Sequence, residues 1–453
     1  MGFDLWYPAR FIARLVQTAT AYKAKLLCAG IFVSGRTARS LLTEDLAVDT
    51  LAPLRALTSK IDYEQKTVTV SLLGLCRRTA LYRSGLGSTL VLGTTVEELR
   101  SQSTPASNHL QRQPIQTQTL QTAQISQLGN RDRLRSLLDQ AFEEESSSKQ
   151  KRTRAVVLVH RGKIVAERYA AGFSAQTPIL GWSLAKSVVN ALVGILIYRG
   201  KLSLSDSGLI AEWRQPGDAR RAITLEQLLR MSSGLHFSEA YENPFSDVIA
   251  MLLHCGDGAK YAAQQALAEK PGSAFHYASG TTVLLCRIIR EAIGGTLADY
   301  FAFPRQTLFE RLGMASAILE PDAAGTFVGS SFMYATARDW AKLGLLYLQD
   351  GRWWIDGKWV RILPEGWAQF SSSAGKAADF YGAHFWRGVP DSFTIGKRDA
   401  VDWPADAYLA SGYQGQFVTI VPSADLVVVR LGLSHQKHSW DHARFISSIV
   451  FNS

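Results

Sequence analysis

The sequence predicts a protein of the α+β class, with an antiparallel sheet beside a largely helical lobe. Runs typical of β-hairpins occur at residues 155–169 and 416–431, far apart in a chain of 453 residues. The region between them is dominated by apolar runs with helical spacing. We therefore expect one sheet assembled from both ends of this region, with the helical lobe inserted between them.

The chain divides by composition into three parts. Residues 1–100 form a mixed N-terminal extension, in which the alternation at residues 66–72 predicts a strand. Residues 101–129 are rich in Gln, Thr and Ser, which is typical of a linker rather than of packed structure. Residues 130–453 form the main domain, and its helical lobe spans about residues 187–340.

The elements of the main domain follow from periodicity and capping residues. Asn130 is a suitable N-cap for a helix over residues 131–145, and glycine at position 200 ends the long apolar helix that begins near Ser183. The remaining segments are helices at 225–231, 244–253, 280–293 and 338–348, strands at 155–160, 164–169, 416–421 and 426–431, and a C-terminal helix at 441–451.

Composition and charge limit the partners. Hydrophobic residues make up 47% and charged residues 19% of the chain, which excludes wholesale disorder. The net charge is +10, but the basic residues are scattered, and the one dense cluster, residues 149–154, is expected to be a solvated linker edge. We expect no nucleic-acid partner. The charge is compatible with a peripheral contact to an anionic envelope surface.

Cysteine usage and hydropathy bear on the compartment. The four cysteines include no C-x-x-C pair; Cys255 and Cys286 are expected to be core thiols, and Cys28 and Cys76 are able to pair if the compartment is oxidising. No window is apolar enough to span a membrane, and residues 1–25 lack the apolar core of a signal peptide. The protein is expected to be cytoplasmic, or extracytoplasmic (periplasmic) if a leader has been removed.

The candidate nucleophile is Ser183, followed three residues later by Lys186. The pattern Ser-x-x-Lys occurs five times in the chain, but only Ser183 stands at the head of a long apolar helix. Residues three apart in a first helical turn share a face, so the hydroxyl and the amine would meet. Burial and the positive helix end both disfavour an ammonium ion, which suits Lys186 as a neutral base for the serine. The alternative is that Ser183 caps the helix and Lys186 extends to water.

Four segments carry a family resemblance. They are residues 182–187 (WSLAKS), 228–235 (LLRMSSGL), 277–279 (YAS) and 411–416 (SGYQGQ). In this order they resemble the serine β-lactamase-like hydrolases, and most of all the class C branch with its esterases and the 6-aminohexanoate-dimer hydrolases. The resemblance covers about residues 130–453 and implies a β-lactamase/transpeptidase-like fold.

The resemblance implies a role for each matching residue. Ser183 would be acylated, Lys186 would take its proton, and Tyr277 would relay a proton to the leaving group. The backbone N–H groups of Ser183 and Tyr413 would form the oxyanion hole. The expected substrate-binding residues are Tyr241, Ser279, Ser411 and Gly412, of which Tyr241 resembles a tyrosine that assists amide cleavage in the 6-aminohexanoate-dimer hydrolases. The reaction needs no metal or organic cofactor.

One position departs from the family pattern. The triplet before Tyr413 reads Ala410-Ser411-Gly412, so the cation that commonly meets the carboxylate of a β-lactam is missing. We therefore expect a serine hydrolase acting on a small ester or amide. The alternatives are a penicillin-binding protein, D-amino-acid peptidase or β-lactamase, and a non-catalytic envelope-binding module on a hydrolase fold.

Two other constellations are weaker. His435, His438, Asp441 and His442 are close in sequence but straddle a loop and a helix start, and no H-E-x-x-H motif accompanies them. The G-x-S-x-G motif of α/β-hydrolases does not occur in the chain.

Overall fold

The computed structural model describes residues 6–46, 49–102, 117–122, 131–144, 150–391, 401–435 and 439–451. Its main sheet has five antiparallel strands in the order β12-β13-β14-β5-β6. The strands are β5 (Thr153–His160), β6 (Lys163–Tyr169), β12 (Tyr408–Gly412), β13 (Gln416–Val421) and β14 (Leu426–Gly432). The N- and C-terminal hairpins of the main domain join through β14 and β5, where Val428 pairs with Leu158. The predicted sheet, assembled from both ends of the region, is confirmed.

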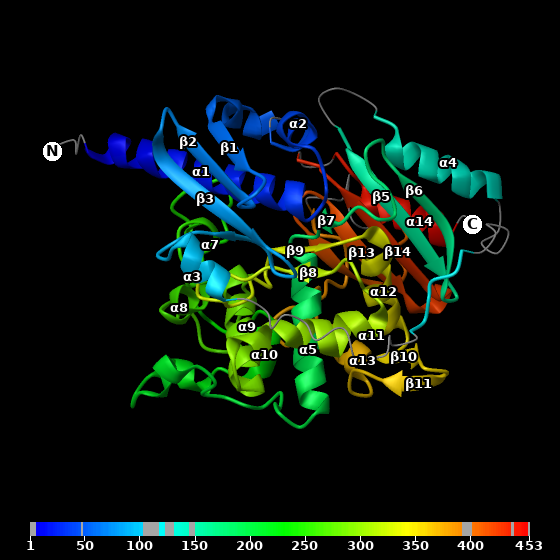
Figure 1. Cartoon of the computed structure of the whole chain (residues 1–453). Coiled ribbons are helices and arrows are strands. Elements are labelled where there is room, and N and C mark those ends of the chain that lie inside the picture. Colours follow the sequence, from blue (N-terminus) through cyan, green and yellow to red (C-terminus); the bar gives the residue numbers. More distant parts are fainter. Residues whose placement is uncertain are drawn as a thin grey trace.

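Helices cover both faces of this sheet (Figure 1). On one face lie α4 (Arg131–Phe142) and α14 (His442–Val450), whose apolar side chains form a separate small core with β5, β13 and β14. On the other face lie α12 (Ala337–Leu348) and α5 (Leu184–Tyr198). The strands are apolar on both faces because both are covered. The start of α5 therefore lies at the edge of the sheet, beside β12.

The inserted region is mostly helical, as predicted, but contains strands that the sequence analysis missed. Its helices are α6 (Leu225–Leu229), α7 (Asp247–Leu253), α8 (Gly258–Ala263), α9 (Ser279–Ile293), α10 (Leu297–Pro304) and α11 (Glu310–Leu312), followed beyond α12 by α13 (Trp367–Ser372). The short strands β7 (Ile179–Leu180), β8 (Ile318–Leu319) and β9 (Met333–Ala335) form a small sheet, and β10 (Arg352–Ile355) pairs with β11 (Lys358–Arg361). None of these five strands is among the elements expected from the sequence, because runs of two to four residues are too short to show a period.

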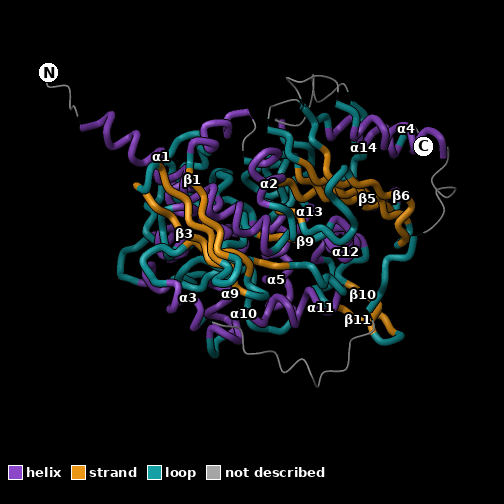
Figure 2. The backbone as a smooth tube through the Cα atoms, turned by 45° about the horizontal axis from the view of Figure 1, so that its top comes forward, coloured by secondary structure: helices purple, strands orange, loops and turns teal. Residues whose placement is uncertain are grey.

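The N-terminal extension has a sheet of its own. Strands β1 (Thr58–Asp62), β2 (Thr67–Leu72), β3 (Leu75–Arg83) and β4 (Gly87–Leu90) pair in sequence order. The extension also contains the short helices α2 (Ala38–Ser40) and α3 (Val96–Ser101), of which α3 packs on β3. The 27-residue helix α1 (Trp6–Phe32) packs along β2, β3 and β4 (Figures 1 and 2). Buried residues of α1 and β2 belong to the same apolar core as those of α5 and α9. The extension is therefore continuous with the main core.

Part of the expected linker is packed. Residues 117–122 bridge to β10 and β6, through Thr117 opposite Ile355 and Thr122 opposite Ile164, and Leu120 is buried. The expected linker is thus held against the main domain at Thr117, Leu120 and Thr122, while Thr119 and Gln121 are exposed. Residues 103–116 and 123–130, including the expected cap Asn130, lie outside the described part.

The structure bears on the cysteines and on the hydropathy of the helices. Cys28 and Cys76 are both free thiols in the described structure, and burial raises the pKa of Cys28 to about 12. Among the described residues, no helix combines the length and apolarity needed to cross a lipid bilayer.

Candidate active site

The turn that leads into α5 places Ser183 at the edge of the main sheet. The N–H of Gly181 donates to the carbonyl of Met333 in β9 at 2.8 Å, and Trp182 has a positive φ of 48°. Ser183 occupies the N-cap position of α5, but its side chain makes no capping hydrogen bond. It is 9% exposed. The alternative that Ser183 serves to cap the helix is wrong.

Lys186 is buried directly beside this serine. Its Nζ lies 3.1 Å from Ser183 Oγ, 3.2 Å from Ser279 Oγ and 2.8 Å from the carbonyl oxygen of Ser330. The side chain is 2% exposed, so the alternative in which Lys186 extends to water is wrong as well. Burial lowers the pKa of Lys186 to about 8, and the negative charge of Glu239 opposes this shift. A substantial share of the amine is thus neutral near physiological pH.

Tyr277 closes the site from the loop before α9. Lys186 Nζ lies 4.8 Å from the centre of its ring. Burial and the charge of Glu239 raise the pKa of Tyr277 well above its usual value, and the nearby Ser183 hydroxyl lowers it in part. The phenol therefore keeps its proton throughout the physiological range. Serine, lysine and tyrosine, which are 94 residues apart at their extremes, lie together as predicted.

Glu239 is a site residue that the sequence analysis missed. Its Oε1 accepts hydrogen bonds from Ser279 Oγ at 2.5 Å and from the Tyr241 hydroxyl at 2.7 Å. Its Oε2 accepts from the backbone N–H of Ser279 at 2.8 Å. Glu239 lies two residues from Tyr241, which the sequence analysis had named as a substrate-binding residue. Nothing in the sequence indicates that the segment with these two residues reaches Ser279.

The turn between β12 and β13 faces the nucleophile turn. A Cβ atom on Gly412 would collide with the carbonyl oxygen of Gly181, so glycine allows the two backbones to lie in contact. Among the described residues, the backbone N–H groups of Ser183 and Tyr413 donate to no protein acceptor. Two unpaired N–H groups on adjoining turns are the arrangement that an oxyanion hole requires.

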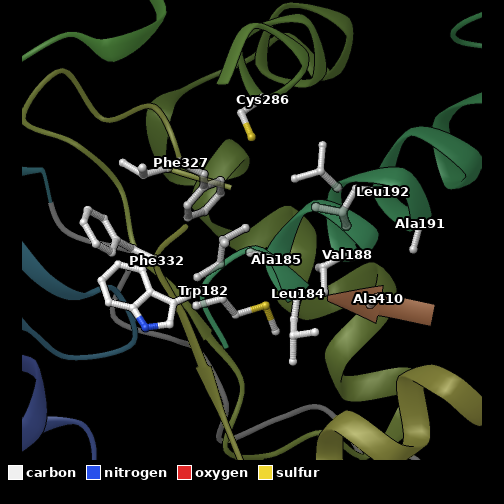
Figure 3. Close-up of a cluster of buried hydrophobic side chains, with 14 of the residues drawn as sticks. Trp182, Leu184, Ala185, Val188, Ala191, Leu192, Cys286, Phe327, Phe332 and Ala410 are labelled. Atoms are coloured by element: carbon white, nitrogen blue, oxygen red, sulfur yellow. The ribbon is translucent and has the colours of Figure 1, made fainter. Parts of the chain in front are cut away.

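Aromatic residues line the neighbouring surface. Tyr413 is 40% exposed, and its ring stacks on that of Tyr241 at 5.4 Å and meets that of Trp182 edge-on at 5.6 Å. Ser411 is partly exposed on β12, whereas Ala410 is buried next to the first turns of α5 (Figure 3). The position of the usual family cation is thus part of the apolar core.

Of the histidines considered as metal ligands, His442 has a structural use. The Nε2 atom of His442 lies 2.7 Å from Thr419 Oγ1, its Nδ1 accepts from the indole of Trp440, and its ring stacks on Phe417. His438 lies outside the described residues. Within the described part of the chain, no three potential ligands of a metal ion come together.

Comparison with known proteins finds similar chains. A 6-aminohexanoate-dimer hydrolase from Paenarthrobacter ureafaciens is 23% identical over 289 residues, which are 62% of this chain and 72% of the relative. Among solved structures, a candidate 6-aminohexanoate-dimer hydrolase from Bacillus anthracis is 24% identical with a TM-score of 0.55, over 74% of this chain and 86% of that one. A penicillin-binding protein homologue from Caulobacter crescentus is 16% identical with a TM-score of 0.53, over 74% and 99% of the two chains. The two structural likenesses concern the fold.

An antiparallel sheet with an inserted helical region, and a serine beside a buried lysine at its edge, define a serine hydrolase with the β-lactamase/transpeptidase-like fold. The chain belongs to the Beta-lactamase family, whose pattern it matches over residues 138–444.

Proposed function

We propose that this hydrolase cleaves small neutral esters or linear amides through an acyl-enzyme on Ser183. The observation that carries the proposal is the 3.1 Å contact between Ser183 Oγ and the Nζ of Lys186, whose pKa burial lowers to about 8. In the first step Lys186 takes the hydroxyl proton, Ser183 Oγ bonds to the substrate carbonyl, and the leaving group departs with a proton. In the second step water attacks the ester and frees the acid.

The hydrogen bonds of Lys186 support its role as the base. Neutral lysine has two N–H donors and one lone pair. The carbonyl of Ser330 can only accept, and the Ser279 hydroxyl, which donates to Glu239, accepts in turn. These two acceptors use both N–H groups, so the lone pair is left for Ser183.

Tyr277 and the two turns complete the proposed machinery. Because its pKa is raised, Tyr277 holds its proton in the free enzyme and is not a second base. It passes this proton to the leaving group and takes up in its place the proton that Lys186 removed from Ser183. The N–H groups of Ser183 and Tyr413 receive the negative charge that develops on the carbonyl oxygen, and each such donor is typically worth about 100- to 1,000-fold in rate.

The lining of the site favours uncharged substrates. Ala410 leaves no cation on β12 at the position that would meet a carboxylate, and the stacked rings of Tyr241 and Tyr413 offer an apolar, partly exposed surface. Tyr241, Ser411 and Gly412 are the proposed contacts of the acyl chain. The site therefore lacks the positive charge that would bind the carboxylate of a penicillin.

The proposal is tested by covalent labelling. Wild-type protein should react with a fluorophosphonate probe, and mass spectrometry should locate the adduct on Ser183. Ser183→Ala should lose both labelling and hydrolysis of p-nitrophenyl esters. Ser373→Ala, in another Ser-x-x-Lys sequence, is the matched control and should keep both. Labelling that persists in Ser183→Ala would overturn the assignment.

A substrate panel separates the candidate reactions. It should contain p-nitrophenyl esters, linear amides, nitrocefin and peptides ending in D-Ala. We expect turnover of esters and linear amides, with little acylation by nitrocefin. Fast acylation by nitrocefin or the D-Ala peptides would favour the β-lactamase or peptidase alternative.

A further inference from the structure

The N-terminal extension lies outside residues 138–444, yet one of its side chains reaches the nucleophile turn. The ring of Tyr22, on α1, is parallel to that of Trp182, with 6.5 Å between centroids and 9° between planes. This is the geometry of an offset stack. Trp182 immediately precedes Ser183, so α1 contacts the backbone segment that holds the nucleophile.

Tyr22 also contacts the opposite turn. The Oε1 of Gln414 accepts a hydrogen bond from the indole of Trp182 at 3.1 Å. Tyr22 and Gln414 line the same cavity, and the Gln414 side chain partly offsets the rise that burial causes in the pKa of Tyr22. Gln414 immediately follows Tyr413. Tyr22 therefore lies against both Trp182 and Gln414. These residues adjoin Ser183 and Tyr413, whose unpaired N–H groups form the proposed oxyanion hole.

The nucleophile turn needs support of this kind. A positive φ at a tryptophan is an unfavourable backbone conformation, and it persists only where the surroundings hold it. Phe332 lies beside Trp182 (Figure 3), with 6.0 Å between the ring centroids. Nζ of Lys25 on α1 lies 4.4 Å from the centroid of the Phe332 ring. The side chain of Trp182 is thus enclosed by residues that α1 contributes or contacts.

We propose that Tyr22 is a positioning residue for Ser183, so that the N-terminal extension is part of the catalytic unit. It fixes the indole of Trp182 and the side chain of Gln414, and through them the spacing between the N–H groups of Ser183 and Tyr413. The inference rests on the proposed role of Ser183.

The test compares acylation rates in full-length variants. Tyr22→Leu removes the stack on Trp182 and the hydroxyl beside Gln414. Since small misplacements of reacting groups cost up to about 100-fold, we expect kcat to fall about 10- to 100-fold with KM changed less than about threefold. Tyr22→Phe, which keeps the ring, should recover most of the rate. If Tyr22→Leu does not fold, Tyr22→Met, with a flexible side chain that fills similar space, replaces it.

Two comparisons distinguish positioning from general stability. Tyr82→Leu is the matched control, because Tyr82 packs on Phe32 of α1 but does not contact Trp182, and it should leave kcat unchanged. In a Trp182→Leu background, Tyr22→Leu should cause no further loss, because the coupling is already broken. A wild-type kcat in Tyr22→Leu, an equal loss in Tyr82→Leu, or additive losses with Trp182→Leu would each overturn the inference. An adduct that is not on Ser183 would instead refute the proposed function.

Discussion

Two buried lysines occupy opposite electrostatic settings in this molecule. Lys186 is 2% exposed and contacts two hydroxyls and a carbonyl. Lys25, on α1, is 3% exposed and forms an ion pair with the fully buried Glu320 at 2.6 Å. Both ammonium groups have lost water, but only Lys25 has a carboxylate in direct contact. Since these two lysines are buried to nearly the same depth, it is the partner that separates the structural cation from the candidate base in this pair.

The two regions use their polar groups accordingly. Glu320 also accepts a hydrogen bond from the N–H of Ser88 on β4 at 2.6 Å, so the pair joins the extension to the segment leading to β9. The carboxylate of Glu239 does not contact the Lys186 amine directly, because the Ser279 hydroxyl lies between them. A direct carboxylate would favour the ammonium form and remove the base.

The largest expected effect is on catalysis at Lys186. Lys186→Met should lower the rate of Ser183 acylation by about 100- to 10,000-fold, the usual contribution of a positioned base. Its free energy of unfolding should stay equal or rise, because a desolvated amine without an ion pair is replaced by an apolar side chain of similar length. Labelling kinetics and denaturant unfolding measure the two quantities. A wild-type acylation rate in this variant would mean that another group is the base.

The reverse pattern is expected at Lys25. Lys25→Met leaves the carboxyl of Glu320 buried without its counter-charge, and should lower the free energy of unfolding by about 3–5 kcal/mol. Adding Glu320→Leu should restore much of that loss, since an apolar pair replaces the buried ions. Denaturant unfolding of the two single variants and the double variant completes the cycle. Equal losses in the single and double variants would show that the ion pair is not what holds the extension.

The pH dependence follows from the pKa of about 8 at Lys186. Acylation should rise about tenfold per pH unit up to pH 8 and then level off, because only the neutral amine accepts the serine proton. For stability the sign is also positive: the unfolded lysine, with its usual pKa of 10.5, binds more protons between pH 8 and 10.5, so this group's contribution to stability increases across that window. A rate independent of pH between 6 and 8 would contradict the assignment of Lys186.

The sequence predicted those parts of the molecule that short-range patterns along the chain encode. The two hairpins, the long helix after Ser183 and the grouping of that serine with Lys186 and Tyr277 follow from periodicity and from ordered motifs, and the structure contains them. The packed residues 117–122 were not predictable, because polar residues that bridge strand edges have the composition of a linker. The ion pair of Lys25 with Glu320 and the stack of Tyr22 on Trp182 join residues 295 and 160 positions apart, and no period or motif encodes such contacts.

The smallest expected effect is at Glu239. The Ser279 hydroxyl lies between its carboxylate and Lys186, whereas the carboxylate of Glu320 contacts Lys25 directly. Glu239 accepts three hydrogen bonds, from Ser279 Oγ, the Ser279 N–H and the Tyr241 hydroxyl. In Glu239→Gln one oxygen becomes an N–H₂ donor. If the remaining oxygen stays on the Ser279 N–H, the new amide donates to Ser279 Oγ, and the serine proton turns toward the lone pair of Lys186.

Glu239→Gln should therefore lower the plateau rate of acylation by about tenfold, the cost of one misdirected hydrogen bond of roughly 1.4 kcal/mol. Because the charge of Glu239 raises the pKa of Lys186, its loss should also move the midpoint of the pH–rate profile to lower pH. Glu242→Gln, an exposed neighbour in the same loop, is the control and should change neither quantity. A loss of rate without the shift would indicate a purely structural role for Glu239, whereas a shift to higher pH would contradict its electrostatic influence on Lys186.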